Sequence, residues 1–410
     1  MKKSLLKKSL LLAVMILLAQ SAYYPCTSAV ISGKATADGR PLLWKHRDSD
    51  SQENKLMYFS GEKFNFIGVI NSSDSTGKEI WMGTNSAGFS IMNTMSYNLN
   101  IGQKCDVPND QEGLFMRAAL ERCANLEDFE KFLDEGKGKW GIAANFGCID
   151  AKGGAAYYET GYYSYMKFDV NDPRVAPNGY LIRTNFSFTG DGEHGMGYIR
   201  FATAIKLFNE YYKDSNITLD FVLKQADRNL QNSLTKSDLN TYPMPEDTTV
   251  TFIPFRDYIV RNSTVSSMIV QGVKPDEDPG LTTMWTVLGF PLTTIVTPVW
   301  VAAGETLPSV TCAEAGKTAP INKKSLALKK KCFPALIDNG RDYLNIAAVK
   351  NKKGTGVLQK LLPKENEIVE KTAELISQWR KNGFKKEDAL KQYKWLDQYV
   401  NKVYKEEFGI

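Results

Sequence analysis

Three residues near the start of the chain could form a catalytic group: Cys26, Arg47 and Asp50. Cys26 follows closely on an apolar N-terminal leader. If proteolysis makes Cys26 the first residue, a single residue carries both a thiol and a free α-amine. An α-amine has an ordinary pKa of about 7.7 to 8.0, which suits a general base near neutral pH. A thiolate attacks amide carbonyls and also leaves easily, so this arrangement predicts acyl transfer from an amide.

Arg47 and Asp50 would complete such a site. Residues 27–32 and 41–46 are apolar runs separated by glycine-containing turns, and they predict a β-hairpin. Closing this hairpin places the end of the second strand opposite Cys26. A guanidinium there lowers the pKa of a thiol, and a carboxylate orients the amine through a charge-assisted hydrogen bond.

The sequence leaves other interpretations of these residues open. Cys26 could be a lipoprotein cysteine, although Tyr24-Pro25 does not provide the small preceding residue that such processing needs. It could also belong to a disulfide, because an exported chain with six cysteines can form three. Arg47 and Asp50 could form a plain surface ion pair. The six cysteines are Cys26, Cys105, Cys123, Cys148, Cys312 and Cys332.

The leader has the features of a secretory signal. Four lysines are followed by an unbroken apolar run over residues 10–19 and by small residues at 19–22. The run is too short for a stable membrane anchor. We therefore expect a signal peptide over 1–22, a short propeptide over 23–25, and an exported, periplasmic or extracellular protein without an integral membrane segment. The uncharged stretch 281–303 contains glycine and prolines, which favours buried sheet and turn.

Charge divides the mature chain into two parts. From Cys26 onward there are 47 basic and 46 acidic residues, but residues 317–410 carry a net +10 and residues 26–316 a net −9. Such asymmetry can indicate a nucleic-acid or membrane arm. The lysines of the tail alternate with acidic residues, and exported proteins seldom meet nucleic acid. We expect a basic tail that packs on an acidic body, with no nucleic-acid partner.

The periodicity of apolar residues predicts an α+β protein. We expect a catalytic domain over 26–316, a mostly helical extension over 317–410, and a surface junction at 322–331. Further strands are expected within 55–70, 79–97, 142–170 and 178–185, and helices within 113–135, 197–212, 365–380 and 386–406.

The stretch "CTSAVISGKATADGRPLLWKHRDSD" (26–50) resembles the opening of the N-terminal-nucleophile hydrolases that use cysteine. The resemblance is greatest to the acyl-CoA:6-aminopenicillanic acid acyltransferase-like group, to which choloylglycine hydrolases and penicillin V acylases are related. Arg47 and Asp50 keep the spacing of that family, while Asp48 stands where asparagine is usual.

Later segments extend this resemblance to about Pro308. "NSAGFSIMNT" (85–94) is similar to the family segment that leads to a strand-end asparagine, here Asn93. "CIDAKGGAAYYET" (148–160) and "VLGFPLTTIVTPVWVAAGETLP" resemble a hairpin and the late core strands. "RTNFSF" makes Asn185 an oxyanion-hole candidate, and "GYIRFATAIKLF" resembles the helix that carries a second active-site arginine, here Arg200.

The resemblance implies a four-layer αββα sandwich with Cys26 at the end of an inner strand. It also implies an amidohydrolase or acyltransferase that matures by autoproteolysis and cleaves a linear carboxamide through a Cys26 acyl-enzyme. Asn185 would hold the oxyanion with Asn93 or a backbone N–H. Arg200 would bind a substrate carboxylate or support Asp50. The expected partner is a small-molecule amide, without cofactor or metal, and a homo-oligomer is left open.

One rival hypothesis is a secreted binding protein that has this fold without catalysis. Tyr23-Tyr24-Pro25 would block the amine of Cys26 if the tripeptide stayed in place. Other catalytic schemes have less support, because the chain has only two histidines and no CxxC, HExxH, phosphate-loop or dinucleotide motif. A pair formed by Cys148 and His194 has no supporting local pattern.

Overall fold

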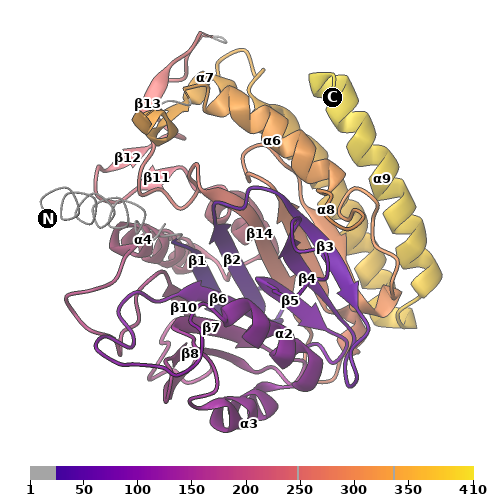
Figure 1. Cartoon of the computed structure of the whole chain (residues 1–410). Helices are drawn as coiled ribbons and strands as arrows, with labels where there is room; N and C mark the ends of the chain where they lie inside the picture. Colours follow the sequence, from indigo (N-terminus) through magenta and orange to yellow (C-terminus); the bar gives the residue numbers. More distant parts are fainter. Residues whose placement is uncertain (1–24, 247–248, 336–337) are drawn as a thin grey trace, which may run out of the picture.

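Two antiparallel sheets form the centre of the protein in a computed structural model that describes residues 25–246, 249–335 and 338–410 (Figure 1). The expected signal peptide over 1–22 lies outside these residues, as do Tyr23 and Tyr24. One sheet has six strands in the order β10-β1-β2-β14-β15-β16, and the other has seven in the order β3 to β9. The first comprises β1 (Thr27–Ile31), β2 (Leu42–Asp48), β10 (Tyr180–Arg183), β14 (Thr264–Gln271), β15 (Thr283–Leu288) and β16 (Thr297–Val299). The second comprises β3 (Asn54–Phe59), β4 (Phe66–Asn71), β5 (Met82–Asn85), β6 (Ser90–Met95), β7 (Ala144–Ile149), β8 (Ala155–Thr160) and β9 (Tyr165–Asp169).

The two sheets pack face to face, and helices cover their outer faces (Figure 1). Strands β1 and β2 lie against β6 and β7. On the outer face of the seven-stranded sheet are α2 (Glu112–Arg122) and α3 (Leu126–Gly136). The six-stranded sheet is covered by α4 (Tyr198–Asp214), α8 (Val357–Asn382) and α9 (Lys386–Phe408). The α+β class and the four-layer αββα order expected from the sequence are confirmed.

The pairing of β1 with β2 decides which side chains meet between the sheets. Ser28 lies opposite Lys45, and residues directly opposite each other share a face of the sheet. The Ser28 hydroxyl lies 2.8 Å from the Tyr157 hydroxyl on β8, so this face looks into the space between the sheets. Because successive residues alternate between faces, Cys26 and Arg47 belong to the same face as Ser28 and Lys45.

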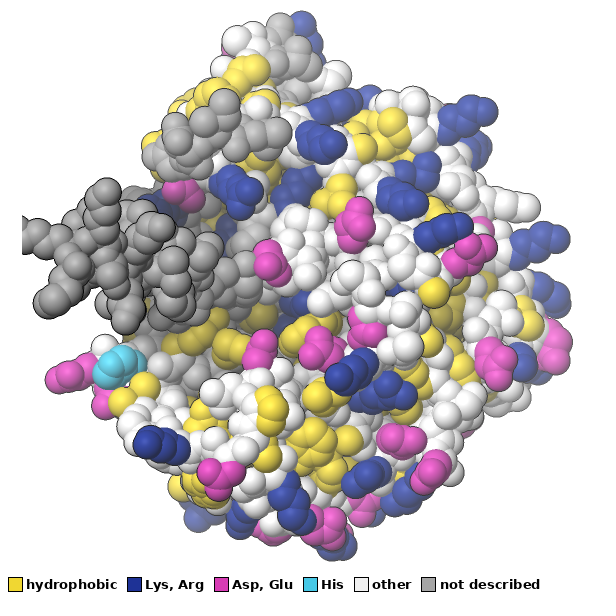
Figure 2. Space-filling view, in the orientation of Figure 1, with side chains coloured by type: hydrophobic (Ala, Val, Ile, Leu, Met, Phe, Trp, Pro, Cys, Tyr) yellow, Lys and Arg dark blue, Asp and Glu magenta, His cyan; other side chains and the backbone are white. Residues whose placement is uncertain are grey.

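The C-terminal helices share a core with the sheets. Trp379 of α8 contacts Trp300 edge-on, with ring centroids 5.0 Å apart, and Tyr393 of α9 stacks on Trp300 at 5.8 Å. Glu365 of α8 forms a fully buried ion pair with Arg228 at 2.5 Å. On the outside, Lys and Arg side chains gather where α6 and α9 run (Figure 2).

Residues 322–331 do not form a surface junction, so that prediction is wrong. They belong to α6 (Pro320–Cys332), whose Asn322 accepts a hydrogen bond from the backbone N–H of Asn54 at 3.2 Å. The Ser325 hydroxyl accepts one from the N–H of Phe290 at 2.9 Å. The lysines alternate with small and apolar residues at helical spacing, so one face of α6 is buried.

The bounds of several helices differ from those expected from the sequence. Residues 113–135 form two helices, because the side chain of Asn125 caps α3 by accepting a hydrogen bond from the N–H of Asp128. Helix α8 begins at Val357, ahead of the expected start at 365, and contains Pro363 in its second turn.

No disulfide joins any of the six cysteines, all of which are in the described residues. Within those residues, no helix combines the length and apolarity needed to cross a bilayer.

Candidate active site

Cys26 lies directly before β1 with 6% of its surface exposed, and its backbone is held by helix α4. Arg200 donates through Nη1 to the carbonyl oxygen of Cys26 and to the Thr27 hydroxyl, the latter at 2.8 Å. Its Nη2 donates to Asn185 Oδ1 at 2.9 Å. Asn185 in turn donates to the Met95 carbonyl at 2.8 Å. Arg200 and Asn185, both expected in the site, are thus linked to Cys26 and to the end of β6.

The first turn of α4 leaves room for the Arg200 guanidinium because a glycine precedes it. Gly197 has φ of +85°, and a Cβ at this position would collide with the guanidinium of Arg200. Arg200 is 1% exposed. Burial, together with the nearby charge of Arg261, lowers the pKa of Arg200 to about 9, so the side chain remains a cation at neutral pH.

Between the sheets, Lys45 lies beside the start of β1, opposite Ser28. Its Nζ donates to Asn93 Oδ1 and to the Trp81 carbonyl, each at 2.7 Å. Burial lowers the pKa of Lys45 to about 8, and a negative charge on Cys26 is the strongest influence in the opposite direction. The chain therefore places a buried amine, close to its titration point at neutral pH, beside the candidate nucleophile.

Arg47 is the second buried cation on this face. It donates to Asn54 Oδ1 at 2.6 Å and to Asn71 Oδ1 at 2.9 Å, and its guanidinium lies 4.7 Å from the ring centre of Trp81. Burial lowers the pKa of Arg47 to about 10, opposed first by a negative charge on Cys26. Lys45 and Arg47 thus place two buried cations on the face of the sheet to which Cys26 belongs.

Arg261 links the carboxylate of Asp48 to the residue before Cys26. Asp48 is 4% exposed and accepts a hydrogen bond from the Thr264 hydroxyl at 2.7 Å and another from Arg261 Nη2. The same nitrogen of Arg261 donates to the carbonyl oxygen of Pro25. Asp50 is exposed, two residues beyond the end of β2, and accepts a bond of 3.4 Å from the Ser49 hydroxyl.

Asn93 and Asn185 differ in the hydrogen bonds that their side-chain amides make. Asn185 uses its amide oxygen for Arg200 and its NH₂ group for Met95. For Asn93, Lys45 holds the amide oxygen, which fixes the plane of the amide and turns the NH₂ group to the opposite side. Asn93 is therefore better placed than Asn185 to donate to an oxyanion.

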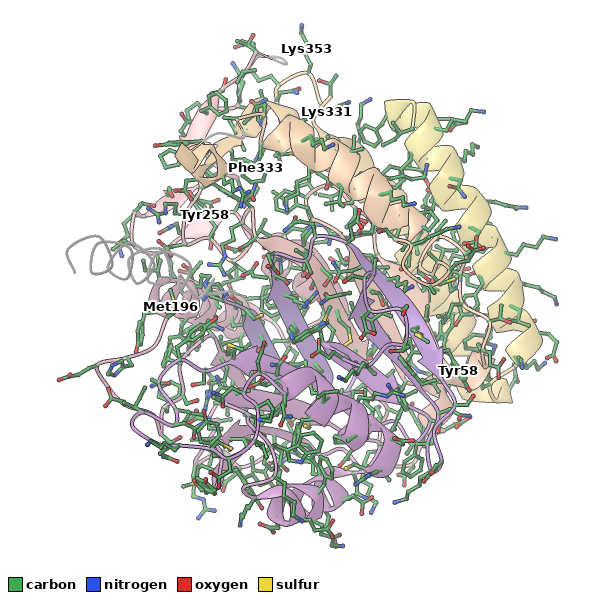
Figure 3. The ribbon with its side chains drawn as sticks, viewed as in Figure 1. Tyr58, Met196, Tyr258, Lys331, Phe333 and Lys353 are labelled. Carbon is green, nitrogen blue, oxygen red and sulfur yellow. The ribbon has the colours of Figure 1, made fainter. Side chains whose placement is uncertain are left out.

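A cavity of about 990 Å³ opens beside Pro25. Phe255 and Phe333 contribute apolar surface, and Figure 3 labels Phe333 just beyond the end of α6, with Tyr258 nearby. Lys329 of α6 is almost fully buried in this wall, and burial lowers its pKa to about 7. The charged residues that line the cavity are Asp50, Glu53, Arg256, Asp257, Arg261, Lys323, Lys329, Lys330, Arg341 and Asp342.

Sequence reasoning missed Lys45, Arg261 and Lys329. The run "LLWKHRD" offered a signal for Lys45, because a lysine in the middle of an apolar strand must be buried with a partner. Arg261 and Lys329 are 235 or more positions from Cys26 in sequence, and no local pattern connects them to it.

The two histidines are not arranged for catalysis. The Nε2 atom of His46 lies 3.0 Å from the carbonyl oxygen of Asp227, and burial lowers the pKa of His46. His194 is exposed and contacts Asp191, whereas Cys148 is buried in β7. Within the described residues, no group of three or more His, Cys, Asp or Glu side chains could hold a metal ion.

Comparison with known proteins gave matches among solved structures only. No protein-family model and no curated protein matches the chain. A Caenorhabditis elegans ortholog of N-acylethanolamine-hydrolyzing acid amidase is 15% identical, with a TM-score of 0.41, over 61% of this chain and 94% of that one. Penicillin V acylase from Agrobacterium tumefaciens is 13% identical, with a TM-score of 0.34, over 67% and 86%. A conjugated bile acid hydrolase from Clostridium perfringens is 12% identical, with a TM-score of 0.34, over 67% and 92%.

Proposed function

We propose that this protein is an exported amide hydrolase whose nucleophile is Cys26, freed by autoproteolytic removal of Tyr23-Tyr24-Pro25. The observation that carries the proposal is the position of Cys26 at the start of an inner strand, on a face that also presents the buried cations Lys45 and Arg47. A cysteine that only filled space would not need two buried cations, because each of them costs desolvation energy.

In the first half of the reaction, the α-amine of Cys26 takes the thiol proton. The thiolate then attacks the carbonyl carbon of the substrate amide, and a C–S bond forms. The NH₂ group of Asn93 donates to the resulting oxyanion, an interaction worth about 2.7 to 4 kcal/mol in favourable cases. Lys45 positions this amide through its bond to the amide oxygen.

In the second half, the tetrahedral intermediate collapses and the C–N bond breaks. The departing amine takes the proton held by the α-amine, which leaves a thioester on Cys26. Water then attacks the thioester and releases the carboxylic acid, with the α-amine acting as base. A second amine in place of water would make the protein an acyltransferase.

Asp48, rather than Asp50, is the carboxylate that we assign to the orientation of the α-amine. Asp48 is buried and reaches the Pro25 carbonyl through a single nitrogen of Arg261, so the two groups are neighbours. Removal of Pro25 creates the α-ammonium beside this carboxylate. Asp50 is exposed and lies on the rim of the cavity.

The cavity beside Pro25 is the proposed substrate pocket. Its wall combines aromatic rings with the cations of α6, which suits a linear amide that has an apolar arm and an anionic group. N-acyl amino acids, conjugated bile acids, penicillin-type amides and peptide-like amides all have this character. We propose that small molecules of this kind are the substrates.

The test is intact mass and N-terminal sequencing of the exported protein, with Cys26→Ala and Cys105→Ala made in parallel. We expect wild type and the Cys105→Ala control to begin at Cys26, and Cys26→Ala to retain Tyr23-Tyr24-Pro25. Release of free amine from a panel of N-acyl amino acids and conjugated bile acids would follow the same pattern. A wild-type chain that keeps the tripeptide would instead support the secreted binding protein.

A further inference from the structure

The peptide bond between Pro25 and Cys26 is held by guanidinium groups on both sides. Arg261 Nη2 donates to the carbonyl oxygen of Pro25, and Arg200 Nη1 donates to the carbonyl oxygen of Cys26. The first of these oxygens belongs to the bond that maturation must break. It is the atom on which negative charge develops when the Cys26 thiolate attacks.

The loop before β14 fixes the guanidinium of Arg261 in this position. Its Nε donates to the Ser263 hydroxyl at 3.2 Å, and its backbone N–H donates to the Thr264 hydroxyl at 3.1 Å. Asp48 binds Nη2, and only 12% of the Arg261 side chain is exposed. A donor that is already oriented stabilises a developing charge without reorganisation.

We propose that Arg261 is the oxyanion donor for self-cleavage, a role that nothing else described above gives it and that rests on the proposed function. Arg261 donates directly to the oxygen of the reacting carbonyl through its guanidinium group. Arg200 holds the other side of Cys26, so the two arginines together fix the scissile peptide.

Self-cleavage before Cys26 needs no reagent other than water. The sulfur of Cys26 forms a bond to the carbonyl carbon of Pro25, and the electron pair of the C=O double bond moves to the oxygen that Arg261 holds. Collapse breaks the bond between this carbon and the nitrogen of Cys26, which takes the proton lost by the thiol. Water then hydrolyses the thioester, yielding the carboxylate of Pro25 and the free thiol of Cys26.

The experiment measures maturation of the refolded full chain by intact mass over time. We expect Arg261→Gln to mature about 100- to 1,000-fold more slowly than wild type, the loss typical of one oxyanion donor. Arg261→Lys should lose less, because it keeps a charged donor. Arg174→Gln is the matched control, because Arg174 is not among the residues that line the cavity, has 87% of its side chain exposed and pairs with Asp172 at 2.6 Å.

A chemical rescue separates catalysis from folding. Added guanidinium ion, at a concentration too low to denature the protein, should accelerate maturation of Arg261→Ala and leave that of Arg174→Ala unchanged. A purely structural arginine would show no such rescue. The inference is overturned if Arg261→Gln matures at the wild-type rate, or if guanidinium has no effect, while Cys26→Ala stays unprocessed. Failure of wild type itself to mature would instead refute the proposed function.

Discussion

Neighbouring side chains of β2 point to opposite faces of the sheet. The charged groups near Cys26 therefore form two sets with different proposed roles. Lys45 and Arg47 enter the space between the sheets, where they meet Asn93 and Trp81. Asp48 is turned toward Arg261 and Thr264 at the end of the strand. A shift of one residue in register would exchange these roles, because it would move each side chain to the other face.

Asp48 and Asp50 provide a matched pair of substitutions. Asp48→Asn should lower kcat/KM for amide hydrolysis by about 10- to 100-fold, because it removes the charge assigned to hold the α-ammonium. Asp50→Asn should stay within about twofold of wild type, since exposed charges contribute little. Both are measured as free amine released by mature protein. Equal losses in the two variants would contradict the assignment.

Loss of the charge on Lys45 should determine where the rate of amide hydrolysis falls at alkaline pH. The Lys45 pKa of about 8 means that the charge is present below that pH and is lost above it. The wild-type rate should therefore fall above about pH 8, and Lys45→Arg should move this fall to higher pH. Lys45→Met should lower kcat by up to about 100-fold through a displaced Asn93 amide.

The control for Lys45 is Lys55→Met. Lys55 is a buried lysine of β3 whose Nζ donates to the backbone carbonyl of Glu314 at 2.9 Å. Its removal should leave the pH profile unchanged. A profile that Lys45→Arg fails to move would exclude Lys45 from control of the reaction.

At the residue level, the resemblance predicted some of the residues that lie near Cys26 and missed others. Arg47 and Arg200 lie beside Cys26 as expected from the resemblance. The assignment of Asp50 followed the family spacing; in the structure β2 ends at Asp48, Ser49 is buried and Asp50 is exposed. Arg261 depends on a loop contact between distant segments, which no local pattern encodes.

Helix α6 places a lysine at the boundary between the sheet and the cavity. Lys329 donates to the Thr264 carbonyl at 3.3 Å, and further to the Gln52 side chain and the Asn262 carbonyl. These contacts connect α6 to the start of β14 and to the segment after β2. The burial of this lysine costs free energy that depends on pH.

Lys329→Met should remove a pH-dependent part of the stability. The pKa of Lys329 is about 7 in the folded protein and about 10.4 in the unfolded chain, so between these values only the unfolded state binds the proton. The unfolding free energy of wild type should therefore rise with pH from about 7 to 10, by up to a few kcal/mol relative to Lys329→Met. Urea unfolding at several pH values measures this difference. A constant difference would contradict the burial of a charged lysine.

Helix α8 is anchored by its buried glutamate. Glu365 accepts from Arg228 at 2.5 Å and from the N–H of Val296 at 2.7 Å. Glu365→Gln leaves Arg228 without its buried partner and should destabilise the protein by about 3 to 5 kcal/mol. Glu370→Gln, on the exposed face of the same helix, should change stability by less than about 0.5 kcal/mol. Chemical denaturation of both variants checks this.

The strands and helices themselves were largely readable from periodicity. The hairpin of β1 and β2, the strands within 142–170 and the helix at 197–212 all lie where alternation or helical spacing indicated them. The start of α8 was missed because a proline normally ends a helix. Here Pro363 lies near the N-terminus of the helix. Helix α6 was not predicted, because its many lysines leave only a narrow apolar stripe in the sequence.

Across the whole molecule, one core joins segments from both ends of the chain. Residues of β1, β2, α4, α8 and α9 belong to the same buried cluster, although more than 350 positions separate its first and last members. The sequence suggested that a basic tail would cover an acidic body. It could not show that Trp300 would be enclosed by α8 and α9, because that contact depends on tertiary packing.

Unfolding should therefore be a single cooperative event. We expect calorimetry, tryptophan fluorescence and circular dichroism to give one coincident transition, because loss of α8 or α9 would expose the core of the six-stranded sheet. Separate melting of a helical unit would show that residues 317–410 form an independent domain.

The contact between Arg261 and the Pro25 carbonyl also bears on what happens after the cut. Hydrolysis replaces an uncharged carbonyl with a carboxylate in front of the same guanidinium, which adds a direct attraction between opposite charges. The severed propeptide should consequently remain as a bound product and delay the first turnover. A synthetic peptide that ends in Tyr-Tyr-Pro with a free carboxylate should inhibit the mature enzyme competitively, and more strongly at low ionic strength.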